Sequence, residues 1–408
     1  MNILFCGPYF SELAIREKSA ISQAGVRWTL GLVNALRGLG HHVTMITHCT
    51  EQMWPKSSIV WQDSNPKWFY GADCRCIGYP NVPFLRTLWL NMRYAAEVRR
   101  ACRETHYDVL LCYNTFVPWH VAAMRAARKL GVKCCPIILD GDDPRKDGWR
   151  KMMRDNRFAD GVIFLSHWLA SHYPMGMPQG GRMPVFQMDG GSDGFNGHRP
   201  SESGEEHLFT VAHTGSLNPQ RELAFIAKML KSYKDPNTRF VFTGKIDRDV
   251  VMRMVDNDSR VEVRGLVSPE ELNRICQDVD VFISARIPDH CDNVVNFPSK
   301  LPNYLSWGRP VVATWVDSLS PDYRKFLFVP VDNTPEGMAQ KLNDVRGLSL
   351  SQRENIYQAI ADWFGMSKTW KAQSLRLLEW ISSLLAVVVT VCVIFDLPRR
   401  GITKLIYG

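Results

Sequence analysis

The stretch from Asn296 to Thr314, "NFPSKLPNYLSWGRPVVAT", decides the fold that we expect. A loop carrying Ser299 and Lys300 leads into an amphipathic segment, which stops at Gly308 before an apolar run. This order predicts a short helix followed by a buried strand. A helix N-terminus offers unpaired N–H groups and a positive dipole end, which favour an anion such as phosphate. The alternative is a capped helix that packs on a sheet and binds nothing.

Strand-like and helix-like segments alternate along both halves of the chain, as is typical of parallel α/β sheets. Between the first two strands lies "GVRWTLGLVNALRGLG", whose apolar residues recur at three- and four-residue steps and predict one helix face. The polar run "GHRPSESGEEH" interrupts this pattern and indicates a linker. The predicted strands are 2–6, 42–47, 74–78, 109–113, 133–139, 161–165 and 185–188 before the linker, and 208–212, 239–242, 260–263, 279–284, 310–314 and 326–329 after it.

We therefore predict an α/β protein with two doubly wound, Rossmann-like domains. The first domain spans residues 1–196, the linker residues 197–207 and the second domain residues 208–365. A helix over residues 366–383 returns to the first domain, and residues 384–408 form an apolar tail. Because open parallel sheets bind ligands beyond the carboxyl ends of their strands, the expected site is the cleft between the domains.

Composition narrows the class of protein. A chain of 408 residues with 45% apolar content suits two packed domains and excludes disorder. The net charge of +8 is scattered along the chain, so it does not require a nucleic acid partner. A basic face that meets an anionic membrane or sugar phosphates explains it as well. An odd count of 11 cysteines without framework spacing favours a reducing compartment. Cys74 and Cys76 lack a companion pair at zinc spacing, so we expect no metal site.

The two ends of the chain bear on localisation. The start, "MNILFCGPYF", lacks a basic region and looks like a first strand rather than a signal peptide, so we expect cytoplasmic catalytic domains. The uncharged run Trp380–Phe395 would form a helix of about 24 Å, shorter than the ~30 Å hydrocarbon core of a bilayer. With the basic residues that follow, it predicts a shallow anchor at the cytoplasmic face of the membrane. The alternative is a helix that packs back on the first domain.

Several stretches, in this order and spacing, resemble one known family: the retaining, nucleotide-sugar-dependent glycosyltransferases of the GT-B fold, in the "family four" group (glycosyl transferases group 1). The stretch "NFPSKLPNYLSWGRPVVAT" is similar to the "FPSKLxEYLAxGxPVV" form of the family's donor-site helix. The stretches are "AGVRWTLGLVNALRGLGHHVTMIT", "YDVLLCYN", "ADGVIFLSHWLASHY", "MDGGSDGFNGHRP", "HTGSLNPQRE", "FTGKID", "VRGLVSPEEL" and "NFPSKLPNYLSWGRPVVAT".

The resemblance implies a set of donor-binding residues. Cations and a helix end would hold the diphosphate without a metal ion. Two departures concern the nucleotide. Ser216 stands where the family often has arginine. Asn303 stands where the family has the glutamate that contacts the ribose, and Val295 stands where it has a second glutamate. The positions that match the family's phosphate site are Gly215, Arg221, Ser299 and Lys300, with Lys245 as a weaker candidate and Asn303 at the ribose.

The acceptor side is indicated by "ILDGDDPRKDGW". Subsets of the family have paired aspartates here, so Asp140 and Asp142 are expected to orient an acceptor hydroxyl; the alternative is that one of them caps the next helix. The family's often-catalytic histidine falls on Tyr113 or Asn114, and neither replaces a good base.

The predicted function is transfer of a hexose or related sugar from a nucleotide diphosphate sugar to a glycan or lipid-linked acceptor in surface polysaccharide biosynthesis. Transfer would retain the anomeric configuration and need neither metal nor cofactor. One alternative is a catalytically silent scaffold or binding subunit of a polysaccharide-assembly complex, which the departures at Ser216 and Asn303 motivate. Another is a sugar-nucleotide epimerase of the same fold.

Overall fold

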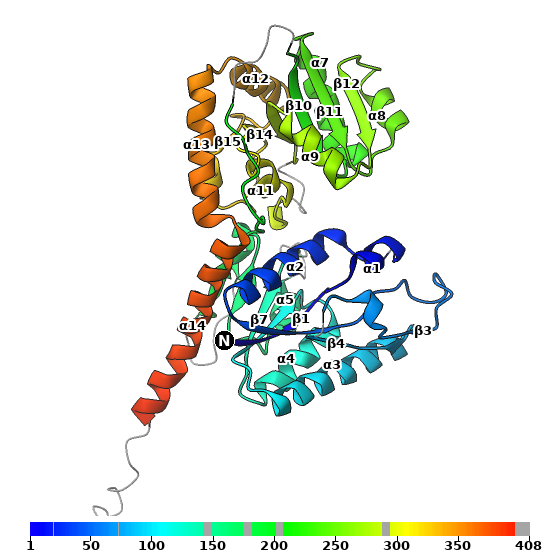
Figure 1. The fold of residues 1–408 in the computed structure, drawn as a ribbon, viewed down its shortest axis with the longest axis vertical. Coiled ribbons are helices and arrows are strands. Elements are labelled where there is room, and N and C mark those ends of the chain that lie inside the picture. Colours follow the sequence, from blue (N-terminus) through cyan, green and yellow to red (C-terminus); the bar gives the residue numbers. More distant parts are fainter. Residues whose placement is uncertain are drawn as a thin grey trace, which may run out of the picture.

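Two parallel β-sheets, one in each half of the chain, form the framework of this protein (Figure 1). The structure is a computed structural model. It describes residues 1–18, 20–71, 73–141, 149–173, 182–200, 207–287 and 294–395, with side chains given as far as Ala386. The predicted α/β class with two Rossmann-like halves is confirmed.

The N-terminal sheet has seven parallel strands in the order β4-β2-β1-β6-β7-β8-β9. Its strands are β1 (Asn2–Cys6), β2 (His42–Thr47), β4 (Cys74–Cys76), β6 (Val109–Tyr113), β7 (Lys133–Ile138), β8 (Val162–Phe164) and β9 (Val185–Gln187). A separate antiparallel pair joins β3 (Trp61–Gln62) to β5 (Tyr79–Pro80). The helices are α1 (Glu12–Glu17), α2 (Gln23–Gly38), α3 (Leu85–Glu104), α4 (Pro118–Arg128), α5 (Trp149–Asp155) and α6 (His167–His172), with a 3₁₀ turn η1 (Pro66–Trp68).

The C-terminal sheet has six parallel strands in the order β12-β11-β10-β13-β14-β15. Its strands are β10 (Phe209–Thr214), β11 (Thr238–Thr243), β12 (Val261–Gly265), β13 (Val281–Ser284), β14 (Val311–Ala313) and β15 (Leu327–Phe328). The helical elements are η3 (Pro219–Leu223, a π-helix), α7 (Ala224–Ser232), α8 (Arg248–Met254), α9 (Pro269–Gln277), α11 (Lys300–Leu305), η4 (Pro321–Lys325), α12 (Pro335–Arg346), α13 (Leu350–Ser367) and α14 (Trp370–Phe395).

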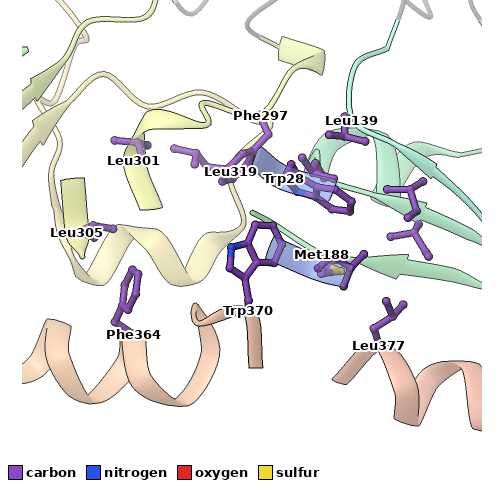
Figure 2. Packing of buried hydrophobic residues seen from close by; sticks show 14 of the residues in the cluster. Trp28, Leu139, Met188, Phe297, Leu301, Leu305, Leu319, Phe364, Trp370 and Leu377 are labelled. Atoms are coloured by element: carbon purple, nitrogen blue, oxygen red, sulfur yellow. The ribbon is translucent and has the colours of Figure 1, made fainter. Parts of the chain in front are cut away.

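The domains meet around Trp370, where α13 passes into α14. Its ring contacts Trp28 of α2 edge to face, with ring centroids 5.6 Å apart. Figure 2 shows Trp370 beside Met188, within one buried cluster that includes residues of both domains. A shared apolar cluster of this kind fixes how the two sheets face each other, because separating the domains would expose it to water.

A buried ion pair lies at the same junction. Lys368, between α13 and α14, pairs with Asp189, which follows β9, and each side chain is less than 5% exposed. Tyr323 Oη donates to Asp189 Oδ2 over 2.7 Å. The Lys368 ammonium also lies 4.4 Å from the centre of the Tyr323 ring. Lys368 and Tyr323, from the second half of the chain, thus hold a carboxylate of the first.

The last helix, α14, follows the first domain. Trp380 stacks on Phe186 of the edge strand β9, with ring centroids 5.3 Å apart. Beyond this contact α14 projects past the domain (Figure 1). The predicted apolar helix at the C-terminus is not supported: within the part of the chain that the structure describes, no helix is both long and apolar enough to cross a bilayer. Residues 396–408 of the predicted tail lie outside the described residues.

Candidate functional site

Gly215 forms the turn at the carboxyl end of β10. Its φ of +97° lies in the region that favours glycine, and its N–H donates to the carbonyl of Thr243 over 2.8 Å. A Cβ at this position would lie 2.9 Å from Cε of Lys300. The positive φ favours glycine at this turn, and the missing side chain leaves room for the end of the lysine. The structure brings these two predicted site residues into contact.

The Lys300 ammonium is held by two acceptors. Its Nζ lies 2.9 Å from Nε2 of His213 and 2.8 Å from the carbonyl oxygen of Ser216. His213 is buried, and its Nδ1 lies 3.2 Å from the carbonyl of Ile283, so Nδ1–H donates there while Nε2 accepts from the lysine. These are its acceptors among the described residues, and an ammonium has three donors, so one N–H is left for a bound anion.

Burial around Lys300 changes the protonation of both groups. It lowers the pKa of Lys300 to about 8, assisted by the nearby charge of Arg286 and opposed by Glu222. Burial, with the charge of Lys300, lowers the pKa of His213 to about 3, which keeps the imidazole neutral. An anion beside Lys300 would favour its charged form, so the site is suited to a negatively charged ligand.

Arg286 was not predicted as a site residue. It follows β13, and its backbone N–H donates to Oγ1 of Thr314 over 2.8 Å. Its charge adds to the burial that lowers the pKa of Lys300 and opposes the burial that raises the pKa of Asp140, so it acts on residues of both domains. The family position that carries a second phosphate cation is Ser216 here, and Arg286 places a cation in the same region. Its position after a buried strand could have indicated a site residue in the sequence, because ligands bind beyond the carboxyl ends of parallel strands.

Asp140 lies in the first domain, two residues after the end of β7. Desolvation raises the pKa of its carboxyl and the charge of Arg286 opposes this, while part of the residue is exposed to solvent. The next residue ties the domains together, because the Gly141 N–H donates to Oδ1 of Asn296 over 2.9 Å. Asp140 thus lies next to a residue that contacts the second domain, and its role toward an acceptor stays a prediction. Asp142 lies outside the described residues.

Tyr113 and Asn114, the positions where the family often has histidine, differ in role. The Tyr113 hydroxyl lies against the start of α2, 2.5 Å from where a Cβ on Gly25 would be, and Asp140 contributes to its raised pKa. Asn114 is buried, with a φ of +50°. Its Oδ1 accepts from the Leu139 N–H over 2.8 Å. Asn114 therefore fixes the loop after β6, whereas Tyr113 lies near the predicted acceptor residue.

A cavity of about 490 Å³ lies beside the Gly215 turn. Lys245 lines this cavity and is exposed. Arg221 lies half-exposed on η3, whose first residue, Pro219, also lines it. Ser299 and Asn303 are exposed at the start and middle of α11. The cavity is bounded by Leu217, Pro219, Leu223, Gly244, Lys245, Ile246, Asp247, Val250, Val251 and Leu266.

The short α11 changes the expected basis of anion binding. The helix has six residues, and the Ser299 side chain makes no capping hydrogen bond. A helix of this length has a smaller dipole than a long one, so the lysine side chain is the stronger positive group. In the described part of the chain, no group of three His, Cys, Asp or Glu residues is placed to hold a metal ion.

Two family matches together cover most of the chain. Residues 24–180 match the glycosyl transferase 4-like domain, and residues 209–346 match glycosyl transferases group 1. No curated protein matches the chain.

Solved structures share the fold at low sequence identity. A glycosyltransferase from Rickettsia africae is 14% identical with a TM-score of 0.63, covering 94% of this chain and 98% of its own. Anabaena HepE in complex with UDP has the same identity and TM-score, covering 94% of this chain and 100% of its own. The lipopolysaccharide outer core galactosyltransferase WaaB is 13% identical with a TM-score of 0.59, covering 94% of this chain and 99% of its own.

Proposed function

This chain belongs to the GT-B glycosyltransferases that use nucleotide sugars, and we propose that it transfers a hexose or related sugar from a nucleoside diphosphate to a glycan or lipid-linked acceptor in surface polysaccharide biosynthesis. We further propose that transfer retains the anomeric configuration and needs no metal ion or other cofactor. The observation that carries the proposal is Lys300, which is held over the Gly215 turn with one N–H left for a phosphate.

The donor would bind on the C-terminal domain. Lys300 and Arg286 would meet the diphosphate, and the cavity beside Gly215 would take the nucleoside, because Leu217, Ile246 and Leu266 offer it apolar walls. Anabaena HepE has been solved with UDP and with UDP-glucose, which supports uridine nucleotides as the first donors to test. The exposed Asn303 would replace the charged ribose contact of the family with a neutral amide.

The chemistry follows from where charge develops. The bond between the anomeric carbon and the diphosphate oxygen breaks, and the leaving diphosphate gains negative charge beside Lys300 and Arg286. The acceptor oxygen forms its bond on the face that the leaving group vacates. Its proton passes to an oxygen of the departing diphosphate, since no strong base is needed where that oxygen is close. Asp140 would orient the acceptor hydroxyl.

A hydrolysis and binding panel tests this function. The protein is incubated with nucleotide sugars that differ in base and sugar, and released nucleoside diphosphate is measured together with thermal stability. We expect release and a stability increase with at least one donor, and loss of release in Lys300→Ala. Binding without release by any donor, even with glycan acceptors added, would favour the silent scaffold. A sugar isomer as the product would favour the epimerase.

Metal independence is tested in the same assay. Cations of the protein would hold the diphosphate, so a chelator should leave the rate unchanged. Loss of all turnover in chelator, with recovery on added manganese or magnesium, would contradict this part of the proposal.

A further inference from the structure

Helices α3 and α4 cover one side of the N-terminal sheet and pack against each other (Figure 1). We call the outer surface of this pair the α3–α4 face. It carries exposed apolar side chains together with a high density of cations. Its exposed residues include Leu85, Leu88, Met92 and Leu130 and the basic residues Arg93, Arg99, Arg100, Arg103, Arg125, Arg128 and Lys129.

One stripe along α3 changes from apolar to basic. Leu85, Leu88 and Met92, at helical spacing, are 46%, 57% and 51% exposed. Farther along the same stripe come Arg99 and Arg103, both exposed. The opposite stripe is buried in the domain and includes Leu90, Tyr94 and Val98. The exposed apolar residues are therefore not core residues of the domain, and they need a different explanation.

Aromatic residues extend the apolar end of the face. Phe84, just before α3, is 92% exposed and has a φ of +60°, a conformation that is strained for a bulky residue. Trp61 of β3 is 53% exposed and lies edge-on to Trp89 of α3, with ring centroids 5.8 Å apart. Exposed tryptophan and phenylalanine next to leucine and methionine are typical of residues that enter the boundary between water and lipid.

The charge of the face is strongly positive. In α3 the acidic residues are Glu97, which is buried and pairs with Arg75 and Arg93, and Glu104, which forms ion pairs with Arg75 and Arg100. The sequence of α4, "PWHVAAMRAAR", has no acidic residue. The remaining arginines are complementary to an anionic surface, and arginine stems can lie along apolar groups while the guanidinium reaches phosphate.

We propose that the α3–α4 face docks on an anionic lipid surface, with Leu88 and Met92 entering the headgroup boundary and Arg99 and Arg103 binding lipid phosphates. A helix of 20 residues is about 30 Å long, so α3 could lie along the membrane plane. The inference does not depend on the donor site or on sugar transfer.

Flotation of the full-length chain tests the face. The protein is mixed with vesicles of phosphatidylcholine alone or of phosphatidylcholine and phosphatidylglycerol in equal parts, over a range of salt. Arg99→Glu with Arg103→Glu should lower binding to the anionic vesicles at least about tenfold, since each basic residue near such a surface adds about 1 kcal/mol. Leu88→Ser with Met92→Ser should lower binding at least about threefold. The matched control, Arg248→Glu with Arg253→Glu on the exposed side of α8, should leave binding within about twofold.

Hydrogen exchange separates the face from the C-terminal tail. On anionic vesicles, amides of residues 84–103 should exchange more slowly, while those of α8 stay unchanged. Unchanged exchange in this segment, or α3 variants that bind anionic vesicles as well as the wild type, would overturn the proposal. Binding to a nucleic acid duplex is measured with the same variants. If the α3 variants lose binding to the duplex but keep binding to the vesicles, the proposal is also overturned.

Discussion

The ammonium of Lys300 and Nε2 of His213 lie 2.9 Å apart, and the histidine accepts. A neutral imidazole thus aims a cation at the carboxyl ends of the donor-domain strands, over a glycine that leaves room for it. The neutral histidine positions the positive charge of Lys300 without neutralising it, whereas a carboxylate partner would neutralise it. This arrangement is suited to a ligand that brings its own negative charge.

Removing the phosphate cations should slow turnover without unfolding the protein. We expect Lys300→Ala and Arg221→Ala each to lower turnover at least tenfold, which corresponds to about 1.4 kcal/mol of transition-state stabilisation. Steady-state release of nucleoside diphosphate, with circular dichroism to confirm folding, measures this effect. Wild-type turnover in both variants would show that the phosphate site was assigned wrongly.

Affinity for a nucleoside diphosphate should fall as the pH rises through about 8. The folded protein lowers the pKa of Lys300 to about 8, so the free site loses its charge above that pH. UDP phosphates are already ionised there, because their second pKa is about 6. The effect on stability has the opposite sign: between pH 8 and the higher pKa of the unfolded chain, the unfolded state binds more protons, so rising pH stabilises the fold. Calorimetric titration with UDP measures the affinity, and Lys300→Gln should remove its pH dependence.

Arg286 should matter more than Lys245, although only the second was expected from the sequence. We expect Arg286→Ala to lower turnover at least about tenfold, and Lys245→Ala to have a smaller effect because that side chain is exposed. Removing the Arg286 charge should also raise the pKa of Lys300, so activity should persist to higher pH. A pH–rate profile of Arg286→Ala that matches the wild type would contradict this role, and Arg286→Lys should restore most of the shift.

The sequence predicts the framework of the fold better than the site. Apolar runs at the strands and the 3.6-residue period of α2 are local signals, so both sheets are predicted with small shifts of their strand ends. The β3–β5 pair was missed because its strands have two residues each, too few to show a period. Gly215 and Lys300 were predicted because their motifs are local.

Non-local geometry accounts for the missed site residues. His213 looks like part of an apolar strand, and its role depends on Lys300, 87 residues away. Asn114 is one of two positions where the family often has a catalytic histidine, and its left-handed backbone and its bond to Leu139 give it a structural role. Such roles depend on contacts across the fold, which spacing along the chain does not contain.

The buried ion pair at the domain junction should be sensitive to loss of one partner. Lys368→Met leaves the Asp189 carboxylate buried without its cation, which typically costs about 3–5 kcal/mol of stability. Urea unfolding followed by tryptophan fluorescence measures the change. Lys341→Met is the matched control, because its pair with Asp344 is solvent-exposed and contributes about 0–1 kcal/mol. Equal effects of the two substitutions would show that burial of the junction pair has no energetic consequence.

Two glycines of α2 should respond in opposite ways to alanine. In an isolated helix alanine is more stable than glycine by about 1 kcal/mol. At Gly31, however, a Cβ would lie 2.1 Å from Nε1 of Trp370, whose ring packs edge-on against Trp28. The ring cannot move freely, since its Cδ2 atom also lies 2.7 Å from where a Cβ on Gly191 would be, so the other side of the ring faces Gly191. We therefore expect Gly31→Ala to destabilise the protein by about 1–3 kcal/mol.

Gly38 is the control in the same helix, because a Cβ there meets nothing within 4 Å. Gly38→Ala should leave the thermal midpoint unchanged or raise it. A lower midpoint for Gly31→Ala, together with faster hydrogen exchange in the first turns of α14, would show that close packing of Trp370 on Gly31 holds the last helix against the first domain. If both variants gain stability, helix propensity alone decides, and the close contact between Gly31 and Trp370 does not constrain the junction.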